Sequence, residues 1–356
     1  MKKILVWLSG GVDSAVSAYL LKKEGYDVTA GFMINYLAPE WEYCPTKDDI
    51  KVAKEVAEYL KIPFFTFDYI EEYEDKVLNY MYEWYKKWIT PNPDIMCNSE
   101  VKFKIFLEEA LKLWFDGIAM GHYSRIVKDK NWIYNLKKWI DSNKDQSYFL
   151  AGLNQFQLSK ALFPIWNLEK PDVRKIAEEI GLPNAKRKDS QWICFVWKVN
   201  MSDFLEKKIN PKKWLVKNTS WKILWEHKWV FYYTIGQRKW LDIWGQSEAI
   251  FIVKKDLEKN EIIVWNSNDL ELYWKDLILN NINFLNPSYK KYFEENTILK
   301  CNTKIRYRQK DQESIISKIS ENKYKVEFKK EQRAIASGQI CAIYIWDELT
   351  MSWIIL

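Results

Sequence analysis

Glycine is scarce in this chain of 356 residues. Only 11 glycines occur, about 3% of the sequence, where globular proteins have roughly 7%. Tryptophan, which is ordinarily rare, occurs 20 times. Aromatic residues make up 16% and charged residues 29% of the chain, which excludes a disordered or low-complexity polymer. The hydrophobic share of 48% suffices for a sizeable core, and the length indicates two or three domains.

Cysteine and histidine are also few. The cysteines are Cys44, Cys97, Cys194, Cys301 and Cys341, widely spaced and without a C-x-x-C pair, and only two histidines occur. This pattern disfavours a disulfide scaffold and a structural zinc site, so we expect no metal held by side chains. It favours a reducing, cytoplasmic setting with one or two functional thiols and the remaining cysteines structural.

Neither sign of charge dominates, and long apolar runs are missing. Lys and Arg number 54 against 48 Asp and Glu, a net charge of +6 that is compatible with a polyanionic partner without requiring one. No uncharged apolar stretch approaches the ~18 residues of a membrane span. Met1 leads almost directly into apolar residues 4–8 without a signal-peptide pattern. We therefore expect a soluble protein with no membrane partner.

The order of strand-like and helix-like segments predicts the domain organisation. Strand patterns at 3–9, 27–34, 63–69 and 116–126 alternate with helical patterns at 15–26, 47–62 and 101–113. This alternation predicts an α/β domain with a parallel sheet covered on both faces. From about residue 220 short β-like runs predict small all-β modules, at 228–235, 248–256, 261–265, 303–309, 323–328 and 339–346. The predicted domains are 1–205, 206–270 and 271–356.

The first motif with chemical content is SGGVDS, residues 9–14, between a predicted strand and a predicted helix. Its two glycines let the backbone approach a ligand, and the free amides and dipole of a helix start suit an anion. It lacks the lysine of the Walker loop. S-G-G-x-D-S resembles the PP-loop of ATP pyrophosphatases, which cleave ATP between the α and β phosphates. A plain strand–helix turn is the alternative.

Two further motifs each present a cysteine. In TPNPDIMCN (90–98), two prolines stiffen a loop that holds Asp94 and Cys97 at a fixed separation, where a carboxylate can exchange a proton with a thiol. Taken alone, Cys97 fits a small buried apolar residue better than a nucleophile. Cys194 lies in KDSQWICF (188–195) after a basic run, and nearby cations favour the thiolate. Cys194 is the better candidate for a reactive sulfur, with a core cysteine as the open alternative.

Taken together, the three motifs resemble the tRNA-specific 2-thiouridylase family. Further matches are GHYSRI (121–126), DSNKDQSYFL (141–150), residues 163–190, YYTIGQRK (232–239), KIRYRQ (304–309) and the pair Gly338-Gln339. The resemblance covers essentially the whole chain. It implies a Rossmann-like PP-loop ATP-pyrophosphatase domain, a central β-rich domain and a C-terminal β-barrel. It also implies an enzyme that replaces the C2 oxygen of the tRNA wobble uridine by sulfur, releasing AMP and pyrophosphate.

Carried over position by position, the resemblance implies roles for individual residues. Cys194 would carry the persulfide, Cys97 would be the partner thiol that ends in a disulfide with it, and Asp94 would be the general acid–base at the target base. The implied nucleotide-binding residues are Trp7, Leu8, Ser9, Gly10, Gly11, Val12, Asp13, Ser14, Met33 and Gly121. The implied tRNA contacts are Asn92, Pro93, Asp94, His122, Lys144, Asp145, Gln146, Arg306, Tyr307 and Gln339.

The same resemblance implies ATP with Mg²⁺, tRNAs of the Lys, Glu and Gln types, and a cysteine desulfurase or sulfur-relay protein as donor. Other interpretations stay open. The chain could be another PP-loop adenylating ligase or amidotransferase, although ligation needs no persulfide and no cysteine pair. Locally, His122 also fits a strand-end histidine, residues 186–188 fit a solvated basic face, and Arg306 and Arg308 fit the outward positions of a strand.

At many positions where the family pattern has glycine, this chain has tryptophan. The positions are Trp7, Trp88, Trp114, Trp139, Trp166, Trp192, Trp197, Trp214, Trp221, Trp225, Trp229, Trp240, Trp244, Trp265, Trp346 and Trp353. Reassigning them would return glycine to its usual share of about 7%. Many stand in turn-like sequence, although Trp221, Trp225 and Trp229 recur every four residues and could form a helical face; the β-branched and aromatic residues that follow favour hairpins.

Our hypothesis is that the source reads UGA as glycine and that these residues are glycine in the native protein. The codons of the gene decide it. If the tryptophans are genuine, a catalytically inactive tRNA-binding homologue becomes a serious alternative.

Overall fold

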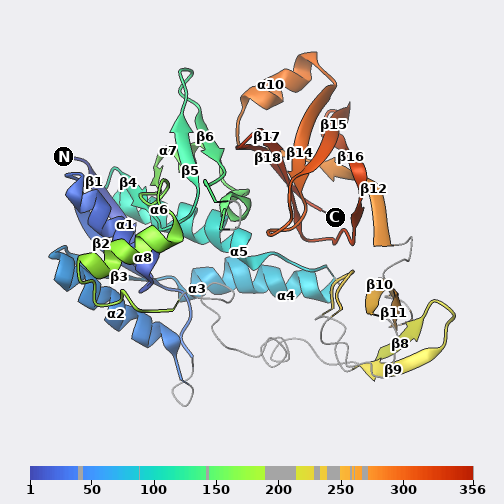
Figure 1. Ribbon diagram of the computed structural model, residues 1–356, viewed down its shortest axis with the longest axis horizontal. Helices are drawn as coiled ribbons and strands as arrows, with labels where there is room; N and C mark the ends of the chain where they lie inside the picture. Colours follow the sequence, from blue (N-terminus) through green and yellow to red (C-terminus); the bar gives the residue numbers. More distant parts are fainter. Residues whose placement is uncertain are drawn as a thin grey trace.

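The structure, a computed structural model, describes residues 1–38, 43–87, 89–141, 144–188, 214–227, 233–238, 249–256, 259, 261–266 and 272–355. Cys194 and most of its motif lie outside the described residues, as does the larger part of the predicted β-run 228–235. Figure 1 shows the arrangement of the elements.

The first half of the chain contains β1 (Lys3–Trp7), α1 (Val12–Lys23), β2 (Asp27–Ile34), α2 (Pro45–Leu60), β3 (Phe64–Asp68), α3 (Ile70–Tyr73), the π-helix η1 (Glu74–Leu78), α4 (Asn79–Lys86), α5 (Pro93–Met96), the π-helix η2 (Cys97–Ile105), α6 (Phe106–Lys112), β4 (Gly117–Ala119), β5 (Arg125–Lys128), β6 (Tyr134–Lys137), the 3₁₀-helix η3 (Ser147–Leu150), α7 (Gln155–Ser159), β7 (Ala161–Leu162) and α8 (Lys170–Glu179).

The second half contains β8 (Trp214–Asn218), β9 (Ile223–His227), β10 (Ile250–Asp256), β11 (Glu261–Asn266), β12 (Tyr273–Asn280), β13 (Asn283–Phe284), α10 (Ser288–Glu295), β14 (Ile298–Lys304), β15 (Gln312–Ser320), β16 (Lys323–Arg333), β17 (Ile340–Ile345) and β18 (Glu348–Ile354).

A five-stranded parallel sheet in the order β3-β2-β1-β4-β7 forms the centre of the N-terminal domain. Because successive side chains of a strand point to opposite faces, β1 supplies both cores. Ile4 and Val6 pack with α1, α2 and α8, whereas Leu5 and Trp7 pack with η1, η2 and α6. The prediction of an α/β domain with a sheet covered on both faces is confirmed.

The rest of the described chain is β-rich, as predicted. β10-β11-β8-β9 form a four-stranded central sheet. A nine-stranded sheet holds β12, β16, β15, β14, β17, β18, β6 and β5 in that order, with β13 paired to β18. β8 and β9 are an antiparallel hairpin, so Trp221 lies in its turn and Trp225 on a strand. The helical alternative is therefore wrong for these two residues, and Trp229 lies outside the described residues.

Two predicted β-runs are shorter than expected. β14 ends at Lys304, and residues 305–309 form a turn in which the Gln309 amide donates to the Arg306 carbonyl over 3.2 Å. The alternation of Arg306 and Arg308 along a strand is therefore wrong, because the Gln309 side chain also accepts from the Ile305 amide and closes the turn. The predicted strand 116–126 is divided into β4 and the start of β5.

The β5–β6 hairpin physically joins the N-terminal domain to the C-terminal sheet (Figure 1). β6 pairs with β18 through Leu136 and Leu349, and Arg125 forms an ion pair with Asp347 over 2.6 Å. Nearby, buried Asp145 lies 3.6 Å from the Lys304 ammonium of β14. A buried carboxylate needs charged or hydrogen-bonding partners, and this pair is one contact between the two domains.

Thr90 connects three parts of the chain. Its amide donates to the Ser337 carbonyl over 3.1 Å, and its own carbonyl accepts from the Gln339 side chain over 3.0 Å. Its hydroxyl lies 3.1 Å from the Thr234 hydroxyl of the central segment. The loop that leads to Cys97 is thus held by both β-rich modules.

No helix among the described residues is long and apolar enough to cross a membrane.

The close contact at Gly338 gives a stability prediction. Gly338 has φ +89°, and a Cβ there would lie 2.3 Å from the Thr90 carbonyl oxygen. Gly25 has φ +86° with nothing near its Cβ position, so it is a matched control. We expect Gly25→Ala to lower the free energy of unfolding by about 1–2 kcal/mol, from backbone strain alone.

Gly338→Ala should add a loss of about 1–3 kcal/mol, because the methyl group displaces Thr90. Urea denaturation of the two variants measures the difference. Equal losses would show that the contact between Gly338 and Thr90 does not hold the loop.

Candidate active site

The phosphate loop is a tight connection between β1 and α1. After Leu8, whose amide still bonds the Gly31 carbonyl at 2.9 Å, the chain turns through Gly10 with φ +79°. α1 begins at Val12 after Gly11, which offers no side-chain cap. The first amides of a helix have no acceptor within the helix, and they lie at its positive end. The start of α1 therefore suits phosphate oxygens.

Hydroxyl groups close this loop from inside. The Ser14 hydroxyl donates to the Gly11 carbonyl over 3.0 Å and accepts from the Ser9 amide over 3.2 Å. Gly121, which follows β4, lies against the start of α1. A Cβ on it would approach the Ser14 amide nitrogen to 2.9 Å. Only glycine allows the two chain segments to approach this closely, so Gly121 packs against the phosphate loop, and its contact with a nucleotide stays a prediction.

The segment after α8 holds the turn at Gly10. The Gly10 carbonyl accepts from the side chains of Asn184 at 3.0 Å and Arg187 at 3.1 Å. Arg187 also forms an ion pair with Asp49 of α2. Burial raises the pKa of Asp49, and the charge of Arg187 opposes that rise. Of residues 186–188, therefore, only Lys186 and Lys188 are exposed, whereas Arg187 points into the site.

Asp13 is held by a lysine that the sequence reasoning missed. The Lys170 ammonium lies 2.6 and 2.8 Å from the two carboxylate oxygens of Asp13, and the Tyr123 hydroxyl donates to one of them over 2.7 Å. Lys170, Asn184 and Arg187 all fall in the matched stretch 163–190, which was the available signal. Their individual roles depend on contacts with residues more than 130 positions away.

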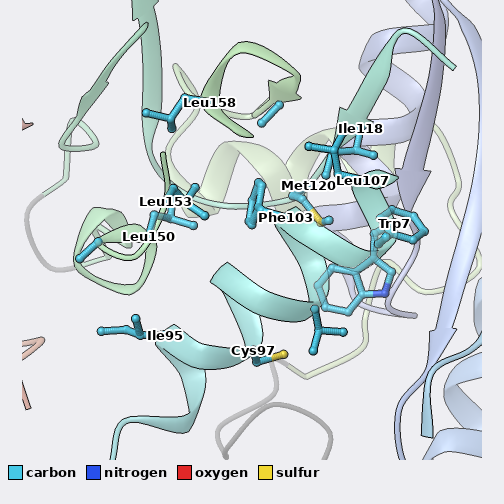
Figure 2. Close-up of a cluster of buried hydrophobic side chains, with 14 of the residues drawn as sticks. Trp7, Ile95, Cys97, Phe103, Leu107, Ile118, Met120, Leu150, Leu153 and Leu158 are labelled. Carbon is cyan, nitrogen blue, oxygen red and sulfur yellow. The ribbon is translucent and has the colours of Figure 1, made fainter. Parts of the chain in front are cut away.

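Cys97 lies in the same core as the end of β1. Cys97 and Met33 are fully buried, and Trp7 is 9% exposed; all three belong to one cluster. Figure 2 shows the indole of Trp7 reaching from β1 towards the helical segment that carries Cys97 and Phe103. The Lys102 ammonium lies 4.6 Å from the centre of the indole. The start of α1 suits phosphate oxygens, and the indole fills the core at the end of β1, two residues before the loop.

Asp94 lies one helical turn before Cys97. Asn92 caps α5 by accepting from the Ile95 amide over 3.3 Å, and Pro93 starts the helix at a position that needs no amide donor. η2 continues α5, so Asp94 and Cys97 lie on one continuous helical segment. Burial, and then the charge of Asp145, raises the pKa of Tyr307.

Several expected tRNA contacts are occupied within the protein. Asp145 accepts from the amides of Trp139 and Ser147, the Gln146 side chain accepts from the Tyr123 amide, and Gln339 bonds Thr90. Arg306 is exposed but donates to the Ala334 carbonyl. Lys144 is exposed to solvent.

His122 lies between two aromatic rings. Its imidazole is 8% exposed and packs against Phe103 at 5.7 Å and Phe163 at 5.6 Å between ring centres. Burial, together with the positive charge of Lys102, lowers the pKa of His122 well below its usual 6.5. The histidine is thus neutral and internal in the structure. Among the described residues no group of three or more His, Cys, Asp or Glu could hold a metal ion.

Three family profiles match the chain in succession. A "tRNA methyl transferase HUP domain" matches residues 2–198, a "tRNA methyl transferase PRC-barrel domain" residues 202–266 and an "Aminomethyltransferase beta-barrel domain" residues 274–351. The tRNA-specific 2-thiouridylase MnmA of Staphylococcus epidermidis is 42% identical over 347 residues, covering 96% of this chain and 92% of the relative. That of Mycoplasma capricolum is also 42% identical, over 361 residues, covering 97% and 96%.

The chain belongs to the tRNA-specific 2-thiouridylase family. A third 2-thiouridylase, from Alkaliphilus oremlandii, is 40% identical over 346 residues and covers 96% of this chain and 93% of its own. The likeness therefore extends through the central and C-terminal modules. The family resemblance read from the three sequence motifs is confirmed.

The clamp on Asp13 gives a second prediction. Lys170→Met should lower the free energy of unfolding by about 1–3 kcal/mol, because Asp13 is largely shielded from water and would lose its main partner. Tyr123→Phe removes one hydrogen bond and should cost about 0.5–1.5 kcal/mol. Lys175→Met on the same helix is the control, since its ion pair with Glu179 is exposed and worth little. A Lys170→Met loss no larger than that of Lys175→Met contradicts the clamp.

The buried imidazole gives a third prediction. The unfolded chain protonates His122 below pH about 6.5, while the folded chain keeps it neutral to lower pH. The free energy of unfolding should therefore fall, as the pH drops below 6.5, by up to about 1.4 kcal/mol per pH unit from this group. Urea denaturation of the parent and of His122→Phe at several pH values measures it. Identical pH dependences would mean that His122 titrates normally in the fold.

Proposed function

We propose that this protein is an ATP-dependent tRNA-uridine 2-sulfurtransferase that thiolates C2 of the wobble uridine. One observation carries the proposal: the end of β1, which leads into the phosphate loop, and the thiol of Cys97 belong to one buried cluster, with Asp94 one helical turn before that thiol. An enzyme that uses ATP to activate an oxygen and a thiol to deliver sulfur needs these groups together. Family membership supports the same activity.

The first half-reaction is activation of the base. The phosphates of ATP bind at the open amides of α1, and the C2 oxygen of uracil attacks the α-phosphorus. The bond between the α and β phosphates breaks, pyrophosphate leaves, and Asp94 accepts the N3 proton of the base. A carbonyl oxygen is a poor leaving group, whereas the same oxygen bonded to AMP leaves readily. Mg²⁺ on the phosphate oxygens would neutralise developing charge.

The second half-reaction transfers sulfur. The terminal sulfur of a persulfide on Cys194 attacks C2, and the oxygen departs as part of AMP. The Cys97 thiolate then attacks the Cys194 sulfur, which breaks the persulfide S–S bond and leaves sulfur on the base. The Cys97 thiolate and the Cys194 persulfide become one disulfide, the transferred sulfur gains two electrons, and Asp94 returns the proton to N3, so the balance closes. An external reductant must restore the Cys97 and Cys194 thiols before the next turnover.

Positioning of Asp13 and Gly10 follows from the structure. Lys170 keeps the Asp13 carboxylate at the start of α1, and Arg187 keeps the Gly10 carbonyl turned away from the anion side of the loop. Both cations lie beside the loop, where their charge also favours a polyphosphate. The target base must leave its stack to reach the site, as bases of a single-stranded loop can.

The finer parts of the proposal concern partners and place. The substrates are tRNAs of the Lys, Glu and Gln types, and the sulfur comes from a cysteine desulfurase directly or through a relay protein. The enzyme works in the cytoplasm, where thiols stay reduced. The expected tRNA contacts, among them Lys144 and Arg306, belong to this proposal as well.

A reconstituted reaction tests the function. Protein with the residues found in its source cell is incubated with ATP, Mg²⁺, cysteine, a cysteine desulfurase and each tRNA, and 2-thiouridine and AMP are quantified by mass spectrometry. We expect equal amounts of the two products. Cys194→Ser and Cys97→Ser should abolish 2-thiouridine, and Asp94→Asn should lower kcat by about 10²–10⁴-fold. Cys44→Ser, a buried cysteine outside this chemistry, is the matched control.

The outcomes separate the alternatives. AMP without thiolated tRNA would favour a different adenylating ligase or amidotransferase. Binding of tRNA without AMP formation would favour an inactive homologue. Full thiolation by Cys194→Ser would refute the persulfide assignment.

A further inference from the structure

Four tryptophans adopt a backbone conformation that favours glycine. Among the described residues, seven that are not glycine have positive φ, and four of the seven are Trp114, Trp132, Trp221 and Trp346, with φ between 55° and 64°. Bulky residues are genuine outliers in this region because Cβ crowds the carbonyl oxygen. These side chains are also 57–87% exposed, so burial in a core does not compensate the strain.

Trp114 ends helix α6 as glycines end two other helices. Its amide bonds the Leu111 carbonyl at 3.1 Å, and the Phe115 amide bonds the Ala110 carbonyl at 3.0 Å. This pair of bonds is the Schellman motif, whose left-handed residue is usually glycine. α1 and α8 end with the same pair of bonds, and there the left-handed residues are Gly25 and Gly181.

Trp132 and Trp221 occupy equivalent places in two hairpins. The Trp132 amide donates to the Asp129 carbonyl over 3.1 Å. The Trp221 amide donates to the Asn218 carbonyl over 2.9 Å. This is a type I turn followed by a left-handed residue, the place of the glycine in a G1 bulge. The position of Trp132 was not recognised from sequence.

Trp346 lies in a third hairpin. Ile345 pairs with Glu348, so Trp346 is the first residue of a two-residue loop. Positive φ at that position alone is typical of a type II′ turn, which has glycine there.

Two tryptophans, buried Trp139 and partly buried Trp353, show a second kind of misfit. The indole nitrogens of Trp139 and Trp353 are buried and have no hydrogen-bond partner in the part of the chain that the structure describes. Buried indoles normally donate this hydrogen bond, and leaving it unmade is destabilising. Both positions are among those where the family pattern has glycine. The backbone of the turns and the unpaired indole nitrogens are thus two independent observations that favour glycine at tryptophan positions.

Trp7 is another tryptophan at a position where the family pattern has glycine, and it lies next to the candidate active site. Trp7 pairs with Gly31 on the neighbouring strand and ends β1 two residues before Ser9. Its indole lies in the core beside the helix of Cys97, with the Lys102 ammonium 4.6 Å from its centre (Figure 2). A nucleotide with its phosphates at the start of α1 must extend through the space next to the end of β1. With glycine at 7 opposite Gly31, that volume becomes open and borders a lysine and a thiol.

We propose that residues 7, 114, 132, 221 and 346 are glycine in the protein as its source cell makes it, and that the volume now filled by the Trp7 indole receives bound ATP. The second half of this inference rests on the proposed function. The first half does not, because it concerns only the backbone.

The turns are tested by stability. We expect the variant with Trp114→Gly, Trp132→Gly, Trp221→Gly and Trp346→Gly to unfold at a higher urea concentration than the chain printed here. Trp274→Gly is the matched control: this residue is 52% exposed but lies on strand β12, so glycine should lower the midpoint. A four-turn variant that unfolds at the same or a lower urea concentration than the parent overturns the proposal for the turns.

The site is tested by binding in that stabilised four-turn background. Titration calorimetry with a non-hydrolysable ATP analogue compares residue 7 as tryptophan and as glycine. Trp7→Gly should tighten binding at least about tenfold, because the indole must otherwise be displaced. Unchanged affinity, or a Trp7→Gly protein that is unfolded in this background, overturns the proposal for position 7.

A parallel assay of 2-thiouridine separates this inference from the function. Tighter nucleotide binding without thiolated tRNA would uphold glycine at 7 and refute the sulfurtransferase. Thiolation by the Trp7 protein as fast as by the glycine form, with equal affinity for the analogue, would uphold the sulfurtransferase and refute the inference.

Discussion

The left-handed turn at Gly10 is the constraint on which the site depends. It reverses the chain between β1 and α1, so that the open amides of the helix face the carboxyl end of the sheet. The turn is held from outside by Asn184 and Arg187, and the helix start is held through Asp13 by Lys170. The first amides of α1 have no acceptor within the helix, so the turn that presents them needs this external support.

The β-rich modules contact the segment that carries the candidate catalytic residues. They hold Thr90, and with it the loop that carries Asp94 and Cys97, through Ser337, Gln339 and Thr234. The buried pair of Asp145 and Lys304 is a second contact between the N-terminal domain and the C-terminal sheet. Asp145 and Gln339, which the family pattern marks as tRNA contacts, therefore also make contacts between the modules.

The sequence predicted the elements well where one local pattern decides. The continuous apolar run of β1 and the helical spacing after SGGVDS are both local signals, and both elements formed as expected. The addition of the β5–β6 hairpin to the C-terminal sheet has no local signal, since Leu136 meets Leu349 across the domain boundary. The roles of Lys170 and Arg187 were not predicted for the same reason, because their contacts are distant in the sequence. The turn at 305–309 was misread because its residues alternate like a strand, while the Gln309 side chain closes it.

The tryptophans make the central claim testable on a single sample. If UGA is read as glycine, the enzyme that thiolates tRNA in the source cell differs from the printed chain where the backbone is left-handed and at the end of β1. Mass spectrometry of peptides from protein isolated from the source cell tests this most directly. Our account predicts glycine masses for the peptides that span residues 7, 114, 132, 221 and 346. Tryptophan masses at these positions would contradict it.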